Sequence, residues 1–171
     1  VLDIGGGFPA DYLEPAMPIE EFAKPIRDAL AALPPGLRLI AEPGRYIAAP
    51  AGTCIATVTG RALRDGRWWF YLDDGMYGSF NGQLYDHAVY PVRALREDGT
   101  TVPAVLAGPT CDSIDVIREN IELPLLEAGD LIVGHHMGAY TSASASDFNF
   151  IPRARRLAVN LREEPVAADP T

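Results

Sequence analysis

Lysine is nearly absent from this sequence of 171 residues, in which Lys24 is the only one. Cysteine is also scarce, with Cys54 and Cys111 as the two residues that could form a disulfide. Because no secretory signal is visible, we expect two reduced thiols in a cytoplasmic protein. No apolar run approaches the roughly 18 residues of a membrane-spanning helix. Positive charge is in deficit too, because the net charge is −9, which argues against a surface that binds nucleic acid.

The first 51 residues have the pattern strand, helix, strand. Residues 1–4 are a short apolar run that ends in three glycines, which predicts a buried parallel strand followed by a loop. Apolar residues at helical spacing predict a helix over 18–33 that is kinked or delayed at Pro25, and residues 37–41 predict a second apolar strand. This order is typical of a parallel sheet or a (β/α) barrel.

The pattern changes after residue 51. Apolar runs on either side of "RDG" (64–66) predict a hairpin, and the runs around a second turn, "DG" (98–99), repeat the arrangement. "DLIVG" and "RRLAVNL" predict further strands, whereas "SIDVIRENIEL" has a helix-like spacing. We therefore expect a largely antiparallel β domain over 52–163 and a frayed tail over the last eight residues.

Both predicted parallel strands end in loops that contain glycine, "GGG" at 5–7 and "PGR" at 43–45. In (β/α) barrels ligands bind at the C-terminal ends of strands, where bare backbone N–H groups cradle an anion and an arginine adds a charged contact. A tight turn and a solvated Arg45 explain the same residues equally well. Glu42, just after the second strand, is a further candidate, although a carboxylate at a strand end is more often a cap.

Cys111 stands directly before Asp112 in a loop that is rich in turn-forming residues. A thiol there could act as an acid, a nucleophile or a ligand, although a small half-buried apolar side chain is the more common role. The histidines and Cys54 lack the spacing of a zinc site. Taken alone, Asp86 in its polar turn is a solvated carboxylate, and Tyr140 and Phe148 are core or rim residues.

Together, however, five motifs in this order resemble the eukaryotic-type ornithine decarboxylases, in the fold-type III group that includes diaminopimelate and arginine decarboxylases. The motifs are "LDIGGGFP", "AEPGRY", "DDGMYGSFNGQLYDHA", "GPTCDSIDVI" and "MGAYTSASASDFNF". The resemblance covers nearly the whole chain and corresponds to the C-terminal part of such an enzyme. It implies that 1–51 are the last strands of an incomplete (β/α)8 barrel that binds pyridoxal 5′-phosphate. Residues 52–171 would form an antiparallel β-sandwich or barrel-like domain, in a homodimer with shared active sites.

The resemblance also implies roles for individual residues. Several would hold the cofactor phosphate: Gly5, Gly6, Gly7, Gly44, Arg45 and the hydroxyl of Tyr140. Glu42 would pair with the pyridine nitrogen and keep it protonated, which makes the ring a better electron sink. Cys111 would return a proton to the substrate carbon in the partner subunit's site. Asp86 and Asp112 would flank the distal ammonium of a basic amino acid, and Phe148 would line the pocket.

Two stretches depart from the family pattern. "DFNF" ends in Phe150 where glycine is usual, and "GHHMGAY" carries histidines where an acidic or amide pair is common. Both stretches lie near the substrate end of the site, so ornithine and lysine both remain possible substrates. The motifs "CDSID" and "YDHA" favour one of these two over diaminopimelate.

The family's Schiff-base lysine lies on an early barrel strand, a context that Lys24 in its helical segment does not match. We therefore expect this chain to be the C-terminal fragment of a decarboxylase of polyamine metabolism that converts ornithine or lysine to a diamine and CO2, inactive by itself.

Two alternatives belong to other classes of protein. A non-catalytic homologue that binds a regulatory partner, like the antizyme inhibitors, should have lost Cys111, Asp112, Arg45 or Tyr140, and all four are present. A free-standing β-rich binding module is disfavoured because residues 1–47 would then leave barrel strands with unpaired edges.

Overall fold

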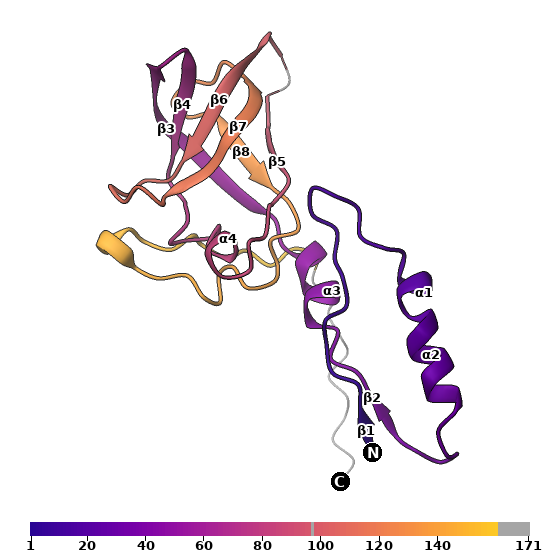
Figure 1. The fold of residues 1–171 in the computed structure, drawn as a ribbon. Coiled ribbons are helices and arrows are strands. Elements are labelled where there is room, and N and C mark those ends of the chain that lie inside the picture. Colours follow the sequence, from indigo (N-terminus) through magenta and orange to yellow (C-terminus); the bar gives the residue numbers. More distant parts are fainter. Residues whose placement is uncertain (97, 161–171) are drawn as a thin grey trace.

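The computed structural model describes residues 1–96 and 98–160 (Figure 1). A narrow N-terminal extension carries β1 (Leu2–Asp3), α1 (Ile19–Phe22), α2 (Lys24–Ala31) and β2 (Leu39–Ile40). It continues through α3 (Gly44–Ala48) and η1 (Ala49–Ala51) into a larger sheet domain. In the described part of the chain, no helix is both long enough and apolar enough to cross a membrane.

The strand–helix–strand prediction for the N-terminal extension is confirmed. β1 and β2 pair in parallel, with Leu2 opposite Leu39. The helix is broken at Ala23, and Pro25 lies in the first turn of α2, where its missing N–H has no carbonyl to bond, so the predicted effect of this proline is confirmed as well. The predicted burial of residues 1–4 is wrong for the described residues, because they are exposed or only half-buried in a sheet of two strands.

The second glycine-containing loop is shorter than the sequence predicts. Pro43 caps the short helix α3, which begins at Gly44 and includes Arg45. The turn formers at 43–44 therefore start a helix instead of extending a loop, and Arg45 is fixed on its first turn.

The sheet domain has six strands in the order β5-β8-β3-β4-β6-β7. Their bounds are β3 Cys54–Arg64, β4 Arg67–Leu72, β5 Val92–Ala94, β6 Thr101–Ala107, β7 Val116–Pro124 and β8 Leu131–Gly134. All neighbouring pairs are antiparallel except β4 and β6, which are parallel. The sheet curls so that its edge strands β5 and β7 approach each other, which confirms a barrel-like domain after the partial barrel. The loops below the strands carry α4 (Gly82–Tyr85) and η2 (Phe148–Phe150).

The local predictions for this domain have mixed outcomes. The hairpin at 64–66 is confirmed, because Asp65 and Gly66 both have the positive φ values, 49° and 76°, that a tight two-residue hairpin turn requires. The second hairpin is wrong, since β5 pairs with β8 while β6 pairs with β4 and β7. The helix-like stretch 113–123 contains most of strand β7 instead, because β6 offers its backbone a partner.

The last predicted strand is not formed as far as the structure describes it. Residues 155–160 are exposed and pair with no strand. Leu161 and the predicted tail at 164–171 lie outside the described residues.

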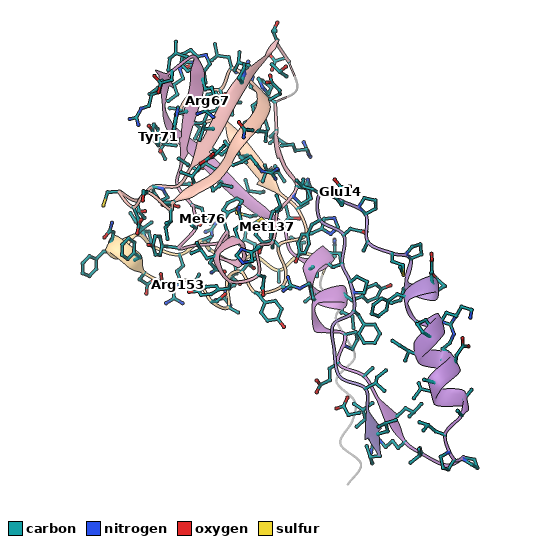
Figure 2. All side chains as sticks on the ribbon, viewed as in Figure 1. Glu14, Arg67, Tyr71, Met76, Met137 and Arg153 are labelled. Carbon is teal, nitrogen blue, oxygen red and sulfur yellow. The ribbon has the colours of Figure 1, made fainter. Side chains whose placement is uncertain are left out.

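The core fills the inside of the curled sheet. In the first half of β3 every second side chain is buried, so that Ala56 and Val58 point inward while Ile55 is exposed. The largest fully buried hydrophobic side chains come from strands and loops alike: Val58, Phe70, Leu72, Phe80, Tyr90, Val105, Leu106, Leu126 and Ile132. Met76 and Met137, both buried, lie in the dense layer of side chains between the strands and the loops below them (Figure 2).

Two glycines join the N-terminal extension to the sheet domain. Met137 donates its N–H to the carbonyl oxygen of Gly52 (2.9 Å), and Gly138 donates to Ala49 (3.0 Å). A Cβ atom at Gly138 would collide with the carbonyl oxygen of Ala48, and one at Gly52 would collide with the backbone of Gly138. The two backbones can approach this closely only because neither position carries a side chain.

Gly138→Ala is therefore expected to lower the free energy of unfolding by about 1–3 kcal/mol, because the new methyl group must push two backbones apart. Urea denaturation measures this loss. The matched control is Gly60→Ala, since a Cβ atom there meets open space and the φ angle is ordinary. Equal stability of the two variants would contradict the tight junction.

Both cysteines are free, as predicted, and they differ in environment: Cys54 is buried and Cys111 is exposed. The Cys54 thiol lies 3.6 Å from Oδ2 of Asp74 and donates to it. Burial, and then the charge of Asp74, raise the pKa of Cys54 from its ordinary 9.0 to about 12. The folded protein therefore keeps this proton at pH values where the unfolded chain loses it.

Between pH 9 and about 12, this difference in bound protons lowers the free energy of unfolding by about 1.4 kcal/mol per pH unit as the pH rises. Cys54→Ala is expected to remove that part of the slope, whatever the packing cost of the substitution at neutral pH. Urea denaturation across this range measures the slope. Parallel profiles for Cys54→Ala and the wild type would show that the Cys54 thiol ionises equally in both states.

Candidate active site

The loops that follow β1 and β2 lie side by side. Ile4 donates its N–H to Ile40 (2.9 Å), and Glu42 donates to the carbonyl oxygen of Gly5 (2.8 Å). Gly5 and Gly7 have φ angles of 69° and 82°, and a Cβ atom at Gly6 would lie 2.7 Å from the carbonyl oxygen of Glu42. The three glycines are thus explained by left-handed backbone at two positions and by a close approach at the third.

Arg45 follows these loops directly and is held from three sides. Its Nη1 donates to the hydroxyl of Tyr12 (2.7 Å), and its Nη2 donates to Oδ2 of Asp86 (2.8 Å). Its guanidinium carbon lies 4.7 Å from the centre of the Tyr140 ring. Partial burial by itself lowers the pKa of Arg45, but the hydrogen bonds to Asp86 and Tyr12 outweigh it and raise this pKa. We call these four residues the arginine cluster.

The arginine cluster and the glycine loop together form a donor set for an anion. A guanidinium has five N–H groups, of which Tyr12 and Asp86 take two. Within residues 1–96 and 98–160, the backbone N–H groups of Gly6 and Gly7 make no hydrogen bond to the protein. Free backbone N–H groups next to a fixed arginine fit a phosphate group.

The structure thus brings most of the predicted site residues to one place. These are Gly5, Gly6, Gly7, Glu42, Gly44, Arg45, Tyr140 and, through its ion pair with Arg45, Asp86. The side chain of Glu42 is exposed beside the glycine loop. Tyr140 itself has a φ angle of 53°, an uncommon backbone conformation for a tyrosine, and more than half of its surface is exposed.

A second group of residues surrounds Cys111 and forms what we call the cysteine cluster: Tyr77, Cys111, Asp112, Phe148 and Asn149. The Tyr77 hydroxyl donates to Oδ2 of Asp112 (2.5 Å), and its ring stacks on Phe148 with 4.0 Å between centroids. Asn149 donates its Nδ2 hydrogen to Sγ of Cys111 (3.6 Å). The hydrogen bond between Tyr77 and Asp112 lowers the pKa of the aspartate and raises that of the tyrosine to about 12.

Asp115 holds the two loops of the cysteine cluster together. Its Oδ1 accepts the N–H of Met76 (2.8 Å), and its Oδ2 accepts the N–H (2.9 Å) and hydroxyl (2.7 Å) of Thr110. Side chains at Gly75 or Gly108 would collide with this buried carboxylate. One buried aspartate and two glycines therefore fix Tyr77 next to Asp112.

The two clusters lie apart within one chain. η2, which carries Phe148, and α3, which carries Arg45, lie on opposite sides of the sheet domain in Figure 1. No hydrogen bond, ion pair or ring contact among residues 1–96 and 98–160 joins the clusters. Asp86 and Asp112, which are predicted to flank one ammonium, are therefore not brought together by a single copy of the chain.

The residues that depart from the family pattern have unusual backbone conformations. Phe150 has a φ angle of 59°, which favours glycine, and its side chain is 97% exposed beside the cysteine cluster. His136 has a φ angle of 58°, and its Nδ1 is buried without a hydrogen-bond partner in the described part of the chain. Over the same residues, no group of three or more histidine, cysteine or acidic side chains is placed to hold a metal ion.

Sequence reasoning missed three residues of the two clusters: Tyr12, Tyr77 and Asn149. Tyr77 and Asn149 stand inside motifs that point to the site, so position alone could have identified them. Tyr12 carries no such signal, because nothing in its neighbourhood indicates contact with a residue 33 positions away.

Comparisons with known proteins bear on both parts of the chain. Residues 1–49 match the family described as "Pyridoxal-dependent decarboxylase, pyridoxal binding domain", and residues 40–138 match "Pyridoxal-dependent decarboxylase, C-terminal sheet domain". The chain is 38% identical over 149 residues to "Lysine/ornithine decarboxylase" of Selenomonas ruminantium and 39% identical over 170 residues to "Ornithine decarboxylase" of Cricetulus griseus. These matches cover 86% and 90% of this chain but only 38% and 37% of the two relatives.

A solved structure agrees with these matches. The lysine/ornithine decarboxylase of Vibrio vulnificus, crystallised with cadaverine, superimposes with a TM-score of 0.90 at 55% identity. The superposition covers 93% of this chain and 44% of that one.

Proposed function

The chain belongs to the pyridoxal-dependent decarboxylases, and from this premise we propose that the whole protein is an enzyme that removes CO2 from lysine or ornithine and releases the diamine. The observation that carries the proposal is the phosphate donor set formed by the glycine loop and the arginine cluster. The names of the relatives, which act on lysine and ornithine, support the choice of a basic amino acid.

The residues of the N-terminal extension would hold pyridoxal 5′-phosphate. Gly6, Gly7 and Arg45 would bind its phosphate, with Gly5 and Gly44 shaping the two loops and Tyr140 adding its hydroxyl. When bound, this cofactor takes up the electron pair that remains when CO2 departs. Glu42, exposed beside the loop, would keep the pyridine nitrogen protonated.

The residues of the cysteine cluster would act on the substrate. Cys111 would give the proton of its Sγ to the substrate carbon that has lost CO2, and Asn149 positions that thiol. Asp112, held by Tyr77, would bind the distal ammonium, and Phe148 would line the pocket. Asp86 would approach the same ammonium from the side of the arginine cluster, because two carboxylates suit one cation.

We propose that each complete site contains residues of two subunits. This is supported by the described residues, among which no hydrogen bond, ion pair or ring contact joins the arginine cluster to the cysteine cluster. In a twofold homodimer, each subunit would supply its arginine cluster to one site and its cysteine cluster to the other.

The substrate assignment is tested by Asp112→Ala in the whole protein. Loss of one charge-assisted hydrogen bond, worth about 1.5–3 kcal/mol, should raise KM for lysine and ornithine by roughly 10- to 150-fold. Asp86→Ala should do the same at saturating cofactor. CO2 release measures both effects.

The matched control is Asp28→Ala, which removes an exposed carboxylate that pairs with Lys24. Its KM should equal that of the wild type. A wild-type protein that releases CO2 from neither lysine nor ornithine, or that prefers diaminopimelate, would overturn the proposed function.

A further inference from the structure

Tyr12 comes from the N-terminal extension, but its side chain reaches the core of the sheet domain. Its ring packs edge-on against Tyr90, with 5.6 Å between centroids and 78° between planes. Tyr90 is fully buried and precedes β5. The core of the sheet domain therefore fixes the position of the Tyr12 hydroxyl, which belongs to the N-terminal extension.

That hydroxyl accepts a hydrogen bond from Nη1 of Arg45. The other terminal nitrogen of the same guanidinium, Nη2, donates to Asp86. With Asp86 alone, the guanidinium could pivot about a single hydrogen bond. A second acceptor on Nη1, with the Tyr140 ring against the face, fixes the plane of the group. A hydroxyl acceptor does this without cancelling the positive charge of the guanidinium, whereas a second carboxylate would cancel it.

We infer that Tyr12 is a positioning residue for the cofactor phosphate: its hydroxyl holds the Arg45 guanidinium so that the remaining N–H groups face the anion. The inference rests on the proposed function of Arg45. Its advantage is preorganisation, because a guanidinium that is already oriented loses less conformational freedom when the phosphate binds.

The decisive variant is Tyr12→Phe in the whole protein, which keeps the ring against Tyr90 and removes only the hydroxyl. We expect Kd for pyridoxal 5′-phosphate to rise about tenfold, as for loss of one hydrogen bond to a charged group. Kd for pyridoxal, which lacks the phosphate, should stay at the wild-type value. Absorbance titration of both compounds measures this difference, and thermal unfolding of the cofactor-free protein should be unchanged.

Two controls separate positioning from a merely structural role. Tyr46→Phe removes a tyrosine hydroxyl on α3, next to Arg45 in sequence, and should leave both Kd values unchanged. In an Arg45→Ala background, Tyr12→Phe should have no further effect on Kd, because the group it positions is gone.

A rise in Kd of equal size for pyridoxal and its phosphate, or the same penalty in the Arg45→Ala background, would overturn the inference. If Arg45→Ala weakens cofactor binding and Tyr12→Phe does not, the inference fails while the proposed function stands. A wild-type whole protein without affinity for pyridoxal 5′-phosphate would overturn the proposed function, and the role of Tyr12 with it.

Discussion

Replacing Arg45 by alanine is expected to raise Kd for pyridoxal 5′-phosphate about 100-fold in the whole protein. The Arg45 guanidinium would make charge-assisted hydrogen bonds to the phosphate, which are stronger than neutral ones. A 100-fold rise in Kd corresponds to a loss of about 2.7 kcal/mol of binding free energy. The substitution removes a guanidinium that the structure already orients through Tyr12, Asp86 and Tyr140. Absorbance titration of the cofactor-free protein measures the affinity.

The Kd of Arg45→Lys should fall between those of the wild type and Arg45→Ala, because lysine keeps the charge but cannot make all the hydrogen bonds of the planar guanidinium. Arg27→Ala is the matched control, since Arg27 is exposed and bonds the backbone of Glu20. Wild-type affinity in Arg45→Ala would mean that this arginine serves only as the structural partner of Asp86.

The second large effect is expected on mixing two inactive variants of the whole protein, Cys111→Ala and Arg45→Ala. Each homodimer should lose activity, because the first lacks the proton donor, worth roughly 100-fold or more, and the second lacks cofactor at a concentration that saturates the wild type. Equal mixing makes half of the dimers mixed. Each mixed dimer contains one site with both Arg45 and Cys111 intact, so about a quarter of the wild-type rate of diamine production should return.

The control for this experiment is a mixture of Cys111→Ala with Asp112→Ala subunits. Both residues belong to the same cluster, so a mixed dimer has one defect in each of its two sites and no recovery is expected. Subunit exchange is verified by mass spectrometry of the intact dimers. Exchange without recovery in the first mixture would place Cys111 and Arg45 of one subunit in the same site.

Sequence reasoning predicted those parts of the fold that depend on neighbouring residues. The turn at Asp65 and Gly66 and the helix break before Pro25 are local, and both are confirmed. The partners of β5 and β6 depend on strands far along the chain, and the turn "DG" at 98–99 contains no information about them. For the same reason the helix-like spacing at 113–123 was misleading: pairing with β6 outweighs a weak periodic signal.

The candidate site shows the same difference between local features and contacts that depend on the fold. The glycine loop, Glu42 and Arg45 were predictable because each follows a strand whose end marks the ligand-binding edge of a barrel. The ion pair between Arg45 and Asp86 joins residues 41 positions apart and follows only from the fold. Asp115 could not be assigned its role from sequence either, because its three hydrogen bonds go to backbone and hydroxyl groups that no spacing rule connects.

The parallel pairing of β4 with β6 has a consequence for how the chain folds. A hairpin such as β3–β4 can close early, but β6 can join β4 only after residues 73–100 have looped back, which costs chain entropy before any new contact forms. This same excursion carries Tyr77, Asp86 and Tyr90. Each cluster therefore includes residues of this long connection, so neither half of the site can be complete before the non-local pairing of β6 with β4 has formed.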